Sequence, residues 1–122
     1  MGKSTHDNAI DSLLTYISGN ATQIHVCSAE PTTRAEAVTT YNLASGTVTS
    51  GDFTLANGDV SGRKHTVAAQ AGLSISATGS GNHVAITSGT ELLDVTTCTA
   101  IALTSGGTVD IGAFDHEVTD PS

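Results

Sequence analysis

Hydrophobic residues recur with a helical period near the N-terminus. Four aliphatic side chains at positions i, i+3, i+4 and i+7 would form one stripe along an α-helix: Ile10, Leu13, Leu14 and Ile17. The pattern predicts a helix over residues 5–18, capped by Thr5 or Asp7 and ended by Gly19-Asn20. Such a stripe must be covered, and we expect a sheet face or, alternatively, a partner subunit to cover it.

Beyond this helix the pattern changes. A first strand is expected over residues 22–28, and a short helical turn over 32–38 has Pro31 at its start and Glu36 near the capping-box position. From Tyr41 onward, apolar and polar residues alternate with period two, which is typical of half-buried strands. Further strands are predicted at 47–50, 53–56, 64–70, 73–77, 83–87, 92–98, 100–103, 109–111 and 114–118.

Glycine-rich turns separate these strands. Asn57-Gly58 favours a type I′ hairpin, and residues 79–82, 88–90 and 105–107 are predicted as further turns. Short strands at intervals of about 8–12 residues predict a mainly β fold, an antiparallel β-sandwich or barrel with one N-terminal amphipathic helix. We expect a single domain, residues 1–122, comprising an arm and helix (1–20), a β domain (21–118) and a tail (119–122).

Composition narrows the choice of partner. The chain carries a formal net charge of -8 with only four basic residues, and aromatic residues make up 3%. Binding to nucleic acid or to an anionic membrane depends on clustered Lys and Arg, so neither partner is expected. No apolar run of about 20 residues predicts a membrane span, and the N-terminus does not resemble a signal peptide. We therefore expect synthesis and retention in a cytoplasm.

Candidate chemistry is sparse. His25 and Cys27 share a strand face and could form a metal site with Cys98, but the chain has no CxxC or HExxH motif, so no metal or cofactor is expected. The two cysteines are interpreted as free, buried thiols, with a disulfide as the alternative. Asp52 and Asp59 flank the Asn57-Gly58 turn and could face each other, but are interpreted as surface charges. No catalytic motif is present, and the chain is predicted not to be an enzyme.

Three stretches together resemble a family of small structural proteins of tailed bacteriophages. They are residues 25–33, residues 51–70 around Asp52-Phe53-Thr54-Leu55, and residues 92–118 from Leu92-Leu93-Asp94 to Phe114-Asp115-His116. The resemblance implies a virion component, and a capsid decoration (cement) protein on the outer head surface is favoured. Its partner would be the major capsid protein, and the chain would be a homo-oligomer, with a trimer favoured and a dimer as the alternative.

Two elements are predicted to contact the partner: residues 1–18 and the loop over residues 29–43. The candidate partner-binding residues within them are Ile10, Leu13, Leu14, Ile17, Pro31, Arg34 and Tyr41. One alternative is a structural protein of the tail, head–tail junction or fibre base. More remote alternatives are a small metal-binding domain, an enzyme and a receptor-binding module.

Overall fold

A computed structural model describes residues 7–59 and 62–118 of the chain. One α-helix, α1 (Asp7–Asn20), precedes a mainly β domain, which confirms the predicted fold class. Two short helical segments are the π-helix η1 (Glu36–Thr40) and the 3-10 helix η2 (Ser50–Asp52). The strands are β1 (Gln23–Cys27), β2 (Asn42–Thr47), β3 (Phe53–Asn57), β4 (Arg63–Val67), β5 (Gln70–Ile75), β6 (Gly79–Thr87), β7 (Leu92–Leu103), β8 (Thr108–Ile111) and β9 (Phe114–Val118).

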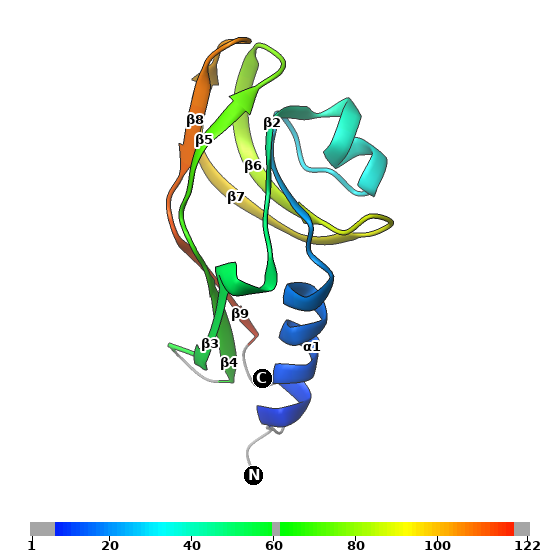
Figure 1. The fold of residues 1–122 in the computed structure, drawn as a ribbon, viewed down its shortest axis with the longest axis vertical. Coiled ribbons are helices and arrows are strands. Elements are labelled where there is room, and N and C mark those ends of the chain that lie inside the picture. The colour runs from blue at the N-terminus through cyan, green and yellow to red at the C-terminus, as the bar shows by residue number, and fades with distance from the viewer. Residues whose placement is uncertain (1–6, 60–61, 119–122) are drawn as a thin grey trace.

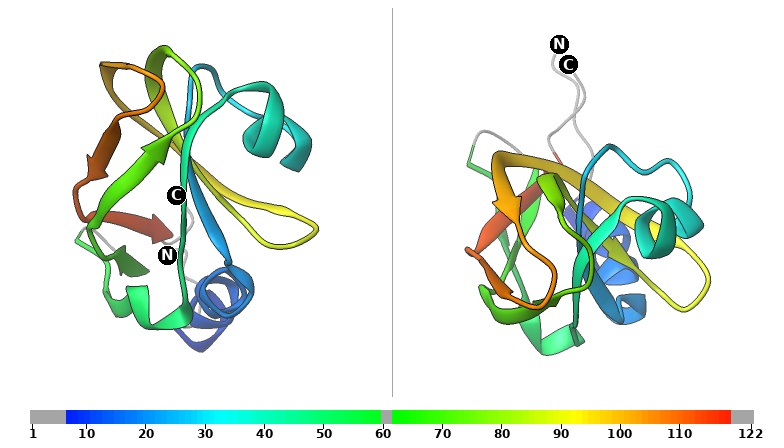
Figure 2. Two further views of the ribbon diagram at one scale, coloured as in Figure 1. Left: turned by 45° about the horizontal axis from the view of Figure 1, so that its top comes forward. Right: turned by 90° about the horizontal axis from the view of Figure 1, so that it is seen from above.

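The strands form two antiparallel sheets. The larger has six strands in the order β7-β6-β1-β2-β5-β8, and the smaller has three in the order β3-β4-β9. Strands β7 and β8 lie at opposite edges of the larger sheet, yet only residues 104–107 separate them in the chain. The sheet must therefore curl until its two edges converge at this turn, which gives the half-barrel seen in Figures 1 and 2. Gly106, with φ of 93°, supplies the backbone conformation that the turn needs.

Aliphatic side chains fill the inner core. Ile24, Val26, Val84 and Leu103 of the larger sheet and Val67 of the smaller sheet are among its buried members. Helix α1 lies against β3, β4 and η2 and covers the smaller sheet. The stripe residues Ile10, Leu14 and Ile17 are buried there, which confirms the prediction that a sheet face covers the stripe. Leu13, the fourth residue of the stripe, is exposed. No described helix has the length and apolar character needed to cross a membrane.

The segment between β1 and β2 covers the outer face of the larger sheet. Ala37 of this segment is buried against Cys27 of β1 and Ala85 of β6, and Tyr41 packs against the three. The predicted helical turn is present. Glu36 N donates a hydrogen bond to Thr33 Oγ1, so Thr33 acts like a helix cap at the start of the turn. The turn continues as η1 to Thr40, two residues beyond the predicted end.

Several strand boundaries differ from the prediction. The predicted strand 47–50 is wrong: the strand is β2, and Ser50 already belongs to η2. The predicted strand 64–70 is two strands, β4 and β5, because the chain passes from one sheet to the other at residues 68–69. The predicted strands 92–98 and 100–103 are the single strand β7.

Two predicted turns also differ. Residues 79–82 lie within β6, whose pairing with β7 begins at Gly79. The Asn57-Gly58 type I′ turn does not form, because no described residue other than glycine has a positive φ. Instead Gly58 N donates to Gly62 O across a longer loop between β3 and β4. The predicted cap Thr5 and the tail 119–122 lie outside the described residues.

Candidate docking surface

The outer face of helix α1 presents two large apolar side chains to solvent. Leu13 and Tyr16, one helical turn apart, are each 50% exposed. The Tyr16 hydroxyl donates a 2.5 Å hydrogen bond to Glu91 Oε1, although the two residues are 75 positions apart. This hydrogen bond raises the pKa of Tyr16, and the negative charge of Glu91 adds to the effect. The contact therefore ties the exposed helix face to the loop that joins β6 and β7.

That loop is a tight hairpin stabilised by its own first residue. Ser88 N donates to Glu91 O (2.9 Å), and Ser88 Oγ accepts hydrogen bonds from Thr90 N (3.1 Å) and Glu91 N (2.9 Å). The predicted turn at residues 88–90 is therefore confirmed. Because the backbone N–H groups of Ser88, Thr90 and Glu91 are all bonded within the hairpin, it holds Glu91 in a defined position for Tyr16.

The segment between β1 and β2 reaches the same hairpin from the other side. Arg34 Nε donates to Ser88 O at 2.8 Å. The Glu36 carboxylate accepts from Thr32 N (2.8 Å) and Thr32 Oγ1 (2.7 Å), and these hydrogen bonds lower its pKa. Pro31, at the start of the segment, is fully buried. The segment is therefore an ordered layer with internal contacts.

We define the docking surface as Leu13, Tyr16, Arg34 and the hairpin 88–91. The hairpin lies between α1 and the segment that carries η1 (Figure 1), and it contacts both. The structure thus joins the two predicted contact elements. Among the candidate residues, Leu13 is exposed and Arg34 and Tyr41 are half-buried, while Ile10, Leu14, Ile17 and Pro31 are buried in the fold itself. Sequence reasoning missed Tyr16 and Glu91, because their contact joins distant parts of the chain.

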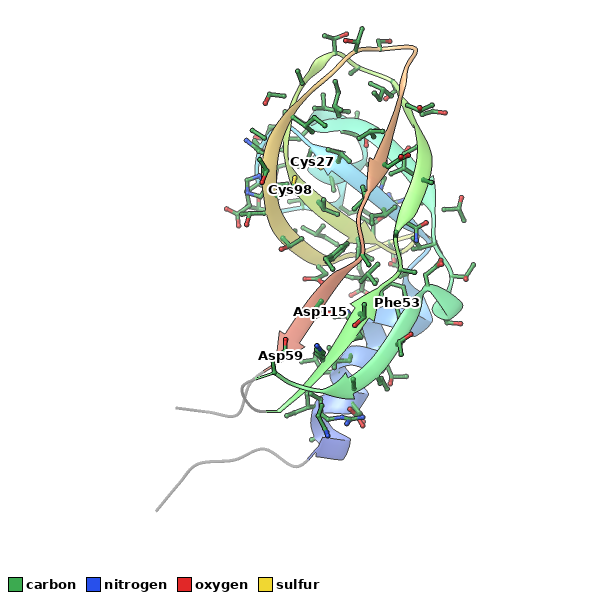
Figure 3. The ribbon with its side chains drawn as sticks, turned by 90° about the vertical axis from the view of Figure 1, so that its left-hand side faces the viewer. Cys27, Phe53, Asp59, Cys98 and Asp115 are labelled. Atoms are coloured by element: carbon green, nitrogen blue, oxygen red, sulfur yellow. The ribbon has the colours of Figure 1, made fainter. Side chains whose placement is uncertain are left out.

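A second feature, also missed from the sequence, is a groove between the edges of β7 and β8. Its volume is about 320 Å³. Val26 and Val84 line it from the sheet, Ile101 from β7, and Val109 and Phe114 from the β8–β9 side. It lies where the sheet fails to close, and Cys98 of β7, labelled in Figure 3, is one of the residues that line it. The groove is mainly apolar, and its polar lining residues are Thr96, Thr97, Cys98 and Thr99 of β7 and Asp110 of β8.

The candidate metal ligands are not brought together. His25 and Cys27 share a face of β1, as predicted, but His25 is hydrogen-bonded to Asn42 Oδ1 and Thr87 Oγ1, both at 3.1 Å. Cys98 lies in the middle of β7 on the groove side, with its thiol exposed, so the expectation of a buried thiol is wrong for Cys98. Both cysteines are free. Within residues 7–59 and 62–118, no three His, Cys, Asp or Glu side chains cluster as a metal site would require.

The two cysteines differ in environment. The Cys27 thiol is buried and donates to Ala37 O at 3.7 Å. Burial raises the pKa of Cys27 to about 11, because the thiolate would lose its solvation. The neutral thiol of Cys27 therefore acts as a small core side chain.

Asp52 and Asp59 do not face each other. Asp52 Oδ2 accepts from Thr49 N (2.9 Å) in the capping box that starts η2, before β3. Asp59, after β3, binds Lys64 Nζ at 2.9 Å, and Asp115 binds the same amine at 3.0 Å. Figure 3 shows Asp59 and Asp115 at the smaller sheet. These carboxylates serve as a helix cap and as ion-pair partners.

Comparisons of the chain with protein-family models, with curated proteins and with solved structures found no match.

Proposed function

We propose that this chain is a decoration protein of a tailed-bacteriophage head, which binds the outer surface of the capsid through the docking surface. The observation that carries the proposal is the exposed pair Leu13 and Tyr16, held against the hairpin 88–91 that also holds Arg34. Three segments distant in sequence thus form one ordered surface. A preordered surface loses little conformational entropy on binding, which favours docking to another protein.

The chemistry of this surface suits a protein lattice. Leu13 and Tyr16 offer apolar area whose burial stabilises a complex by about 25 cal/mol per Å². Aromatic and arginine side chains such as Tyr16 and Arg34 are frequent anchors of protein interfaces. The net charge of -8 disfavours contact with packaged DNA and suits a position outside the shell. The resemblance of residues 25–33, 51–70 and 92–118 to phage structural proteins is the reason for proposing a phage capsid as this protein lattice.

The proposed mechanism is mechanical reinforcement of the capsid lattice. Each copy would bury Leu13 and Tyr16 against the major capsid protein and add contact area across neighbouring subunits. A copy that binds only the expanded lattice would stabilise that lattice by mass action. Several weak contacts made through an oligomer would add avidity.

The proposal is tested first by location. Cryo-electron microscopy of virions of the encoding phage is expected to show copies that follow the capsid symmetry, with α1 and the hairpin 88–91 against the major capsid protein. Density confined to the tail or the head–tail junction, or virions without the chain, would overturn it.

The second test asks whether the docking surface itself is needed for binding to capsids. Deleting residues 1–18 is unsuitable because it removes Ile10, Leu14 and Ile17 from the core. Instead, purified variants are added to capsids produced without the chain, and bound copies are counted. Leu13→Glu is expected to weaken binding about tenfold, since it places a charge in an apolar contact. Leu55→Glu is the matched control, because Leu55 is 42% exposed on β3. Equal binding by both variants would exclude this surface.

A further inference from the structure

The Asn57-Gly58 pair lies where β3 ends and the loop to β4 begins. Asn57 is the last residue of β3, and its side chain is exposed to solvent. Glycine has no Cβ atom, so nothing on Gly58 shields the Asn57 side chain from the backbone nitrogen that follows it. This nitrogen can therefore approach the carbon of the Asn57 side-chain amide, which makes the pair a candidate for chemical self-modification.

A cation holds the side-chain oxygen of Asn57. Arg63 lies opposite Asn57 in the register of β3 and β4, and its Nη1 donates to Asn57 Oδ1 at 2.8 Å. The same guanidinium donates through Nε to Asp11 Oδ1 of α1 at 2.8 Å, and the Arg63 side chain is only 21% exposed. The fold therefore fixes a charged donor at the oxygen on which negative charge would develop if Asn57 were attacked.

We propose that Asn57 is a self-modification site, at which Gly58 N displaces the side-chain amide and the Arg63 guanidinium stabilises the oxyanion. Hydroxide from the solvent removes the proton of Gly58 N. The nitrogen lone pair then forms a bond to Asn57 Cγ, and the carbonyl π electrons move to Oδ1, where Arg63 Nη1 donates. When the carbonyl re-forms, the Cγ–Nδ2 bond breaks, Nδ2 takes a proton from water and leaves as ammonia, and a succinimide ring remains.

Water then opens the ring at either carbonyl, which gives aspartate or isoaspartate. Either product adds a negative charge beside Arg63, in a chain whose formal net charge is -8. The aspartate would bind the guanidinium more strongly than the amide does, because the hydrogen bond would then join opposite charges. The isoaspartate would lengthen the backbone at the Asn57–Arg63 pair and loosen the end of the β3–β4 pairing. This chemistry belongs to the chain alone, so it does not depend on binding to a capsid.

A hydrogen bond of the attacking nitrogen opposes the reaction. Gly58 N donates to Gly62 O at 3.0 Å, and this bond must open before the nitrogen can turn towards Asn57. The bond to Gly62 therefore slows the attack, whereas the bond from Arg63 to Asn57 Oδ1 accelerates it. A variant that merely loosens the loop should react faster, and a variant that removes the oxyanion donor should react more slowly.

Incubation of the purified, folded chain at mildly alkaline pH tests whether the site reacts. Peptide mass spectrometry follows the exchange of NH for O at residue 57, and an ammonia assay follows the leaving group. The unaltered chain is expected to accumulate the product, and Asn57→Gln is not, because its longer side chain would have to close a larger ring. If the folded chain stays unmodified while the chain unfolded in guanidinium chloride reacts, the proposal is overturned.

The role of Arg63 is tested by comparing rates in the folded and unfolded states. Arg63→Gln is expected to slow the reaction of the folded chain about fivefold, because the charged oxyanion donor is lost. It should leave the rate in guanidinium chloride unchanged, because the contact is absent there. Lys64→Gln is the matched control: it removes the same charge from the next residue of β4, whose amine binds Asp59 and Asp115. It should not slow the reaction. An Arg63→Gln variant that reacts at least as fast as the unaltered chain, or a Lys64→Gln variant slowed equally, would overturn the proposal.

Discussion

Gly81 on β6 lies directly against Val26 on β1. A Cβ atom at residue 81 would come within 2.5 Å of Val26 Cγ1 and within 3.4 Å of Leu103 Cδ1. Only glycine therefore fits at this point of the inner sheet face, where Val26 is buried.

The first prediction follows from this contact. Gly81→Ala is expected to lower the free energy of unfolding by about 1–3 kcal/mol, because the stiff Val26 side chain cannot move aside without disturbing its neighbours. Gly89→Ala is the control, since a Cβ there meets nothing within 4 Å. Urea unfolding of both variants measures the difference. Equal stability of the two would show that the core yields more easily than the structure indicates.

The same glycine explains why part of the fold could not be predicted. Residues 79–82 read as a turn, because glycine pairs usually mark turns. Here Gly81 is needed for close packing inside a strand, and that need comes from Val26, which is distant in sequence. Strand β2 was misplaced for a similar reason: Gly46 lies under Leu73, and Ala44 and Ser45 gave little hydrophobic signal. Helix α1 was predictable because its period is local.

The candidate docking surface was predictable only in part. The stripe of α1 was correctly recognised as apolar, but periodicity does not say whether it meets the chain's own sheet or a partner. Ile10, Leu14 and Ile17 are buried against the smaller sheet, and Leu13 is exposed to solvent. The contacts that complete the surface, Tyr16 to Glu91 and Arg34 to Ser88, join positions 75 and 54 residues apart. A periodicity read over a few neighbouring residues cannot predict such contacts.

The second prediction concerns the loss of folding stability at low pH. Burial lowers the pKa of His25 below its ordinary value of 6.5; the hydrogen bond to Asn42 opposes this, and the nearby charge of Arg34 adds to it. The unfolded chain therefore binds this proton more readily. The contribution of His25 to stability is complete above pH about 6.5 and is lost as the pH falls towards the folded-state pKa. We expect the wild type to lose more stability between pH 8 and pH 5 than His25→Gln does, measured by urea unfolding. Parallel losses would exclude His25 as the cause.

The third prediction separates the two thiols. In the Cys98→Ser variant, the remaining Cys27 is buried and its pKa is raised to about 11. Because only the thiolate reacts, Ellman's reagent should modify it only when the chain unfolds. The labelling rate should therefore rise with urea along the unfolding curve. Rapid labelling of Cys27 in the folded variant would show that the segment over it opens without global unfolding.

The fourth prediction concerns the attachment of α1 to the smaller sheet. Arg63 Nε donates to Asp11 Oδ1 at 2.8 Å, and Arg63 Nη1 donates to Asn57 Oδ1 at 2.8 Å. The side chains of Arg63 and Asp11 are only 21% and 26% exposed, so solvent screens the pair incompletely. A double-mutant cycle with Asp11→Asn and Arg63→Gln should give a coupling of about 0.5–1 kcal/mol.

Salt provides the control for that cycle. An electrostatic coupling should shrink as NaCl rises from 0.05 to about 1 M, because the Debye length then falls to about 3 Å. A coupling that is insensitive to salt would assign the stabilisation to packing of the Arg63 stem on α1. A coupling near zero would mean that the buried stripe alone holds α1. In that case Arg63→Gln should leave α1 in place on the smaller sheet.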